Sequence, residues 1–60
     1  MNSYAVTFAW RGPGSVLERE TVKLADAPSS LKAVAIALRA VALDQDIPEL
    51  AVIRNITLTP

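Results

Sequence analysis

The carboxylates are the side chains best suited to catalysis in this chain, because it contains no His and no Cys. The commonest general base, the thiolate nucleophile and most transition-metal ligands are therefore missing. Glu18 and Glu20 stand two apart in a strand-like run, so they share a face, and paired carboxylates can divide acid and base roles. They flank Arg19 beside a turn, where a solvated, charged hairpin end explains them better. We expect no catalytic residues and no enzyme.

Two other segments resemble ligand-binding loops without completing the pattern. Asp44 and Asp46 are spaced like the start of a calcium loop, but the Gly and the distal Glu of that loop are missing. The run 12–15, Gly-Pro-Gly-Ser, joins two strand-like segments, does not open a helix and has no Lys, so it is no phosphate loop. We expect no metal site and no cofactor.

The basic residues offer an alternative function. Arg11, Arg19 and Lys23 are candidate contacts to a nucleic acid, because a basic sheet face or edge can bind phosphates. The chain has 6 Lys and Arg against 6 Asp and Glu, so it carries no general attraction for nucleic acid or anionic lipid. The aromatic residues also fall in the opposite strand phase from Arg11. Solubilising charge is the favoured interpretation of these three residues.

The elements that must position these residues begin with a hairpin. Residues 3–11 alternate with a period of two and place Tyr4, Phe8 and Trp10 on one face, which predicts a strand with an aromatic core face. The run 12–15 predicts a turn. Residues 16–24 predict a second strand whose Val22 and Leu24 enter the core, with the tip of the hairpin extending past the core.

A helix is predicted over residues 31–43, with Ser29 or Ser30 as its N-cap. Pro48 prevents its continuation. One stripe of the helix follows the spacing of a core face and should pack on the sheet together with Ala35: Leu31, Val34, Leu38 and Val41. A second stripe mixes cations with aliphatic residues: Lys32, Ile36, Arg39 and Leu43.

A third strand is predicted over residues 51–58, where Ile53 is out of phase with Ile56 and Leu58. A bulge near 54–55 would bring these three side chains to one face. The expected fold is α+β, a ββαβ domain with a three-stranded mixed sheet in the order 2-1-3 and one helix on one face. The first strand should lie in the middle, antiparallel to both of its neighbours. The predicted sheet core is Tyr4, Val6, Phe8, Trp10, Val22, Leu24, Ile56 and Leu58.

The short chain predicts self-association. Sixty residues form a single domain, 1–60, and such a domain needs an unusually good core or an oligomer when it has no disulfide or metal. A three-stranded sheet has two open edges, and a second copy could pair with one of them. Alternatively, two helices could pack through the second stripe, so Ile36, Arg39 and Leu43 are the candidate self-association residues. No segment is apolar for long enough to cross a membrane, and we expect a cytoplasmic protein.

The order of these patterns resembles small orphan proteins of bacteriophages and mobile elements. The resemblance rests on the aromatic-rich first strand (4–10), the short hairpin, and the run 25–42, in which Ala-Asp-Ala-Pro-Ser leads into an Ala-rich helix. It implies a binding role and assigns no site residues. We therefore predict a small non-catalytic protein-binding module that is homodimeric and has a further protein partner, with nucleic-acid binding as the alternative.

Overall fold

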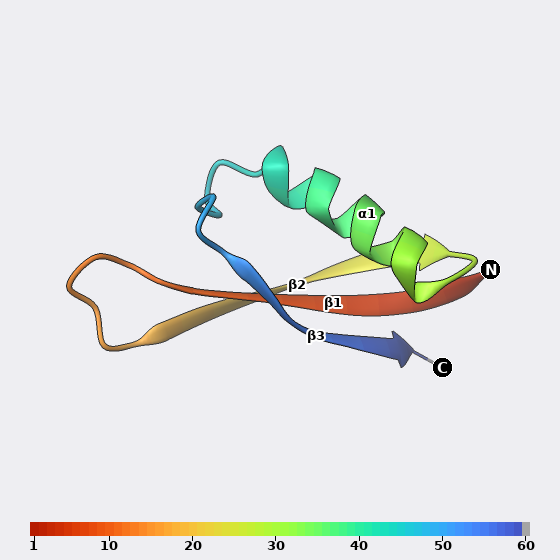
Figure 1. Cartoon of the computed structure of the whole chain (residues 1–60), viewed down its shortest axis with the longest axis horizontal. Helices are drawn as coiled ribbons and strands as arrows, with labels where there is room; N and C mark the ends of the chain where they lie inside the picture. The colour runs from red at the N-terminus through yellow and green to blue at the C-terminus, as the bar shows by residue number, and fades with distance from the viewer. Residues whose placement is uncertain (60) are drawn as a thin grey trace.

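The computed structural model describes residues 1–59. The chain forms β1 (Asn2–Arg11), β2 (Glu18–Ala27), α1 (Ser30–Ala42) and β3 (Val52–Thr59), in that order. Figure 1 shows the helix lying above the three strands, with the hairpin between β1 and β2 projecting beyond it. The predicted elements are confirmed with small shifts of their ends, the largest being the extension of β2 to Ala27.

β1 is the central strand of the sheet, and the order is β2-β1-β3. This order and the α+β class confirm the prediction. Both pairings of β1 are antiparallel, which confirms the predicted direction of each pair, so the description of the sheet as mixed is wrong. β2 and β3 run in the same direction but are separated by β1, so no parallel ladder forms between them.

The predicted bulge in β3 is present. Thr7 pairs with Asn55, whereas the next residue of β1, Phe8, pairs with Ile53, so Arg54 is the extra residue. The bulge reverses the strand phase and puts Ile53 opposite Phe8 and Ile56 opposite Val6, on the helix side of the sheet. Leu58 pairs with Tyr4 on the same side. Because of this extra residue, Ile53, Ile56 and Leu58 lie on one face of the sheet although they do not alternate regularly in the sequence.

The helix begins at the predicted N-cap, where the Ser29 hydroxyl accepts the backbone N–H of Lys32 at 3.3 Å. Its core face differs from the prediction: Ala33 and Ala37 are buried, while Leu31 and Leu38 are exposed. Val34 and Val41 are half-buried, and Ala35 is exposed. The small side chains of Ala33 and Ala37 let the helix approach the sheet closely. The buried stripe of the helix is therefore narrow, and Leu31 and Leu38 lie beside it.

β2 also turns the other face toward the helix than the one predicted. Ala25 and Ala27 are buried, and Val22 and Leu24 are 53% and 76% exposed. The register explains the reversal, because Tyr4 pairs with Ala25 and therefore shares its face. Placing a small residue opposite the tyrosine ring leaves room for the close helix. The larger aliphatic residues of β2 consequently lie on the open face of the sheet.

The core lies where α1 covers β1 and β2. One cluster joins Tyr4, Ala25, Ala27 and Ala33. A second joins Val6, Phe8 and Ala37, with the partly buried Val41, Ala51 and Ile53 against it.

Trp10 is only half-buried, so its predicted place beneath the helix is wrong. A helix of 13 residues spans about 20 Å, whereas a strand of ten residues spans about 33 Å, and Trp10 lies where the strand outruns the helix.

Candidate functional site

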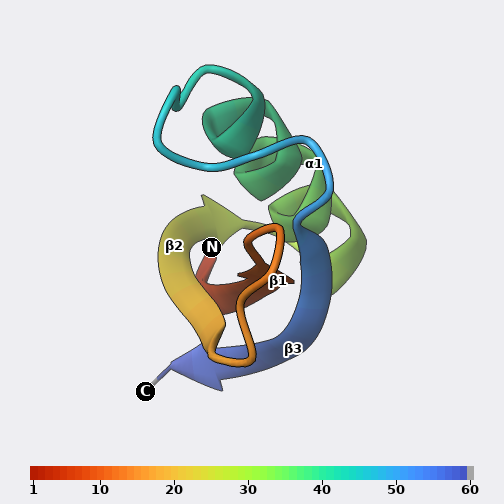
Figure 2. The same cartoon turned by 90° about the vertical axis from the view of Figure 1, so that its left-hand side faces the viewer.

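The helix covers the sheet unevenly. It packs mainly on β2, less on β1 and least on β3, and Figure 2 shows β3 curving away below it. Ile56 and Leu58 point to the helix side of the sheet but remain 36% and 56% exposed. Leu38 and Leu31, seven residues apart on one helix stripe, are exposed as well. We call these four residues the α1–β3 face; they form an apolar surface that the chain leaves uncovered.

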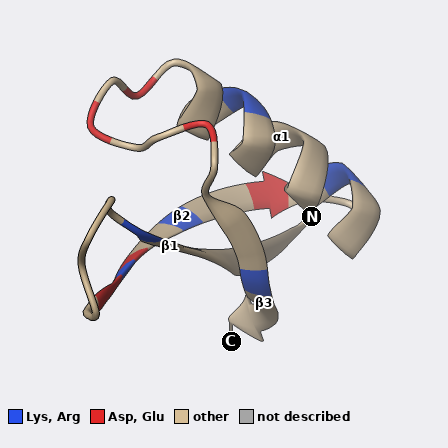
Figure 3. Ribbon diagram, turned by 60° about the vertical axis from the view of Figure 1, so that its left-hand side comes forward, with Lys and Arg blue, Asp and Glu red and all other residues tan. Residues whose placement is uncertain are grey.

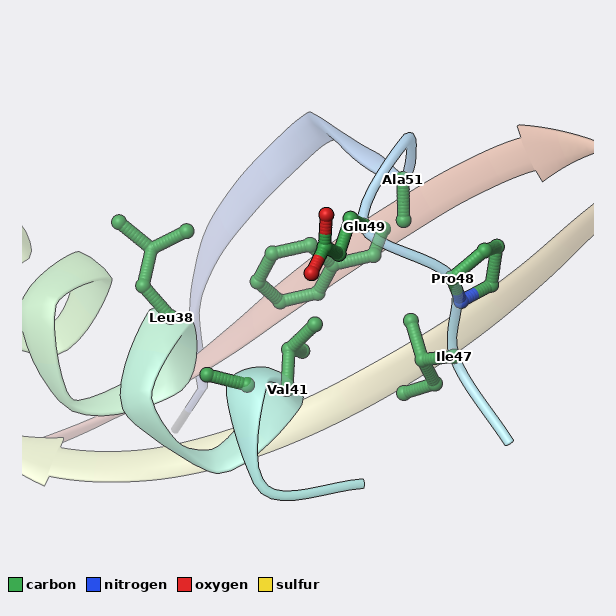
Figure 4. Close-up of a pocket in the computed structure, with 8 residues that line it drawn as sticks. Leu38, Val41, Ile47, Pro48, Glu49 and Ala51 are labelled. Carbon is green, nitrogen blue, oxygen red and sulfur yellow. The ribbon is translucent and has the colours of Figure 1, made fainter. Parts of the chain in front are cut away.

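A pocket of about 250 Å³ adjoins the α1–β3 face and shares Leu38 with it. The pocket lies between the end of α1 and the loop that leads to β3, as Figure 4 shows. Its lining is apolar except for the Glu49 carboxylate: Phe8, Leu38, Val41, Ala42, Ile47, Pro48, Glu49 and Ala51. Small-molecule sites are usually larger, at about 300–1,000 Å³, with several polar groups that fix orientation. This pocket is better suited to one apolar side chain.

The predicted self-association residues lie on the other flank of the helix. Ile36 is half-exposed and Leu43 is almost fully exposed, and Arg39 is exposed between them. All three are accessible to a partner. The two flanks of α1 therefore give two separate apolar surfaces, and the one over β3 adjoins an edge strand whose outer side has no neighbouring strand within residues 1–59.

The structure does not gather the three predicted nucleic-acid contacts into one surface. Arg19 pairs with Trp10 and Lys23 pairs with Val6, which places both on the helix side of the sheet. Arg11 pairs with Glu18 and falls in the opposite phase, on the open face. The Lys23 ammonium is also engaged by Asp44 at 3.0 Å. The arrangement gives no basic patch of these three residues.

The ion pair of Lys23 and Asp44 ties β2 to the end of the helix. Lys23 Nζ donates to Asp44 Oδ2, and the backbone N–H of Asp46 donates to Asp44 Oδ1 at 3.0 Å. The hydrogen bond from Lys23, followed by that from the Asp46 backbone, lowers the pKa of Asp44 from its ordinary value of 3.8. Asp44 thus connects the loop after α1 to β2 and also closes the turn to Asp46.

The paired glutamates of β2, Glu18 and Glu20, also contact a residue of the fold. Arg54, the bulged residue of β3, forms an ion pair with Glu18 and approaches Glu20 with Nε at 3.7 Å from its carboxylate. The contacts span β1, and Ala9, which pairs with Glu20, is buried beside them. Within residues 1–59 no three acidic side chains gather as metal ligands would. The two glutamates therefore connect β2 to β3 across the sheet through exposed ion pairs, which contribute little to stability.

Charge distinguishes the two open edges of the sheet, as Figure 3 shows. β2 carries charge at half of its ten positions: Glu18, Arg19, Glu20, Lys23 and Asp26. β3 has one charged residue, Arg54, which the ion pairs engage, and its segment Asn55–Thr59 is uncharged. Charged side chains commonly protect a strand edge from pairing, so the β3 edge is the less protected of the two. This contrast could have been noticed in the sequence.

No helix in residues 1–59 is long and apolar enough to cross a membrane. Comparison of the chain with protein-family models, curated proteins and solved structures found no match.

Proposed function

We propose that this chain is a small, non-catalytic protein-binding module that acts as a homodimer. The observation that carries the proposal is the uncovered apolar surface. A compact monomer of 6.4 kDa is expected to expose about 3,800 Å², whereas this chain exposes 4485 Å². The excess of about 700 Å² is total accessible surface, to which the projecting hairpin contributes, and it is similar in size to the roughly 800 Å² that each partner buries in a standard protein interface.

Other features support binding over chemistry. The carboxylates with useful spacing are held in ion pairs, and the pocket accepts an apolar side chain rather than a polar substrate. The resemblance to small phage and mobile-element proteins also favours a role in attachment to other proteins. In this proposal the first partner is a second copy of the chain, and the apolar pocket is available to a further protein.

Light scattering after size exclusion tests the dimer. We expect twice the chain mass at high micromolar concentration and a decline toward the chain mass on dilution, because a modest interface dissociates reversibly. A single chain mass throughout the concentration range would contradict the proposal.

A further inference from the structure

We propose that the homodimer forms by antiparallel pairing of β3 with β3 of a second copy, centred on Thr57. This inference rests on the self-association proposed above and adds the surface and the register. The result would be a six-stranded sheet in the order 2-1-3-3-1-2. A two-fold axis perpendicular to the sheet would keep both helices on the same side of it.

The choice of edge follows from charge. The β2 edge carries charged side chains along its length, and pairing two such edges would bury or oppose them. The β3 edge from Asn55 to Thr59 has polar but uncharged side chains that alternate with aliphatic ones. Its outward backbone groups have no strand beside them within residues 1–59. A second β3 would satisfy those groups without desolvating any charge.

The register follows from the bulge. Centring the axis on Thr57 pairs the uncharged segment 55–59 with itself and keeps the irregular backbone at Arg54 outside the new ladder. Ile56 of each copy then lies opposite the partner's Leu58, which is a favourable aliphatic cross-strand pair formed twice. Both residues lie on the helix side, where each is now exposed. Thr57 lies opposite the partner's Thr57 on the open face.

The position of the helix agrees with this arrangement. Because α1 packs over β2 and β1, the two β3 strands would lie in the middle of the sheet with a helix on either side. The Ile56 and Leu58 side chains of both copies would form one apolar floor, bordered by the exposed Leu31 and Leu38 of each helix. The α1–β3 face would thus be completed by its counterpart on the second copy.

A charge swap at Thr57 tests the register, because Thr57 is exposed and lies outside the core. Thr57→Lys alone and Thr57→Glu alone should each weaken the dimer by about fivefold or more, since like charges would face one another at the axis. An equimolar mixture of the two variants should recover a heterodimer at least as tight as the wild-type dimer. The matched control is Val22→Lys, on the same face of the opposite edge strand, which should leave the dimer unchanged.

Crosslinking gives a second readout. The chain has no Cys, so Thr57→Cys introduces a single thiol. A disulfide needs Cα atoms about 4.4–6.8 Å apart, which residues directly opposite on paired strands satisfy. We expect rapid oxidation of Thr57→Cys to a covalent dimer and none for Val22→Cys.

Each alternative mode gives a different pattern. If Thr57→Lys stays as dimeric as the wild type while Leu43→Lys dissociates, the helix flank of Ile36 and Leu43 is the interface and the inference is wrong. If Val22→Lys dissociates and Thr57→Cys fails to crosslink, the open sheet faces stack instead, and the inference is again wrong. A monomeric wild type would overturn the proposed function itself, whichever variant is used.

Discussion

Asp44 is spaced in the sequence like a metal ligand, but in the structure it makes contacts that support the fold. Its carboxylate accepts from Lys23 on β2 with one oxygen and from the Asp46 backbone with the other. The ammonium of Lys23 also lies near the carbonyl end of α1, where positive charge is favourable. The aspartate that could have begun a calcium loop instead closes the turn after the helix and fastens it to the sheet.

The lowered pKa of Asp44 predicts a dependence of stability on pH. Because the folded-state pKa lies below 3.8, the stabilisation is complete above pH 3.8 and is lost as the pH falls through the folded-state value. Asp44→Asn should therefore lower the thermal midpoint at pH 7 by a few degrees at most, and the difference from wild type should close in more acidic solution. The side chain is partly exposed, so the effect is small.

A double-mutant cycle separates this ion pair from other effects of the substitution. Lys23→Met removes the partner and keeps most of the aliphatic stem. Asp44→Asn made in the Lys23→Met chain should then change the thermal midpoint much less than it does in the wild type. Equal effects in both backgrounds would show that the pair with Lys23 is not the cause.

Among the elements, the helix depends on two alanines. Ala33 and Ala37 are completely buried against Tyr4, Val6 and Phe8, so the distance between helix and sheet leaves no room for a larger side chain. The exposed leucines of the same helix contribute little to holding it in place. The stability of the helix on the sheet therefore comes from close approach over a narrow stripe.

Enlarging Ala37 should be costly. Ala37→Leu should lower the free energy of unfolding by about 1–3 kcal/mol, because it forces the helix away from Phe8. A domain of this size has only about 3–9 kcal/mol of stability. Ala35→Leu, on the exposed side of the same helix, is the matched control and should change the value by less than about 0.5 kcal/mol. Urea unfolding at one protein concentration measures both, and equal losses would contradict the close-packing argument.

The same alanines mark the limit of sequence reasoning. Periodicity and residue type predicted every element, and the handedness of the crossover predicted the central place of β1. The N-cap was predicted at Ser29 or Ser30 and the bulge near 54–55, and the structure places them at Ser29 and Arg54. Periodicity failed on which faces are buried in α1 and β2, because it assigned the core to the largest aliphatic residues. Small residues are buried there because they leave room for the large side chains of Tyr4 and Phe8. The pairing register between β1 and β2, which depends on the hairpin loop, decides which face of β2 points to the helix. Neither is visible in a pattern of apolar positions.

The candidate site was predicted only in outline. An open strand edge and an apolar helix flank were both expected, but the predicted flank was that of Ile36 and Leu43, because Leu31 and Leu38 were assigned to the core. The uncovered α1–β3 face arises from the lateral displacement of the helix toward β2. That displacement is a property of three-dimensional packing and has no counterpart in the order of residues.

At the scale of the whole molecule, the chain is elongated, with extents of 40 × 21 × 14 Å. Its radius of gyration is 11.9 Å, whereas about 10.4 Å is expected for a compact chain of this length. The hairpin tip accounts for part of the difference and exposes Val16 and Leu17. The helix covers only part of so long a sheet, which leaves apolar surface at several places.

An apolar interface in a chain of zero net charge predicts that association tolerates salt. We expect the dimer mass by light scattering to be unchanged between low salt and about 1 M NaCl, where charge interactions are screened within a few ångström. A nucleic-acid-binding surface would behave oppositely, with retention on DNA or RNA lost as salt rises. Dissociation of the dimer by NaCl would show that charged contacts hold it together and would contradict the role of Ile56 and Leu58.

If the chain assembles through β3 as proposed, the unequal charge of the two sheet edges would also limit how many copies can join. A chain with two adhesive edges would add copies at both ends and grow into a ribbon, which is the beginning of a fibre. Here β2 ends the sheet with Glu18, Arg19, Glu20, Lys23 and Asp26. Once two β3 strands have met, both outer borders of the assembly are charged β2 strands. In the proposed dimer, assembly would therefore stop at two copies, because the charged β2 edges would disfavour the addition of a third.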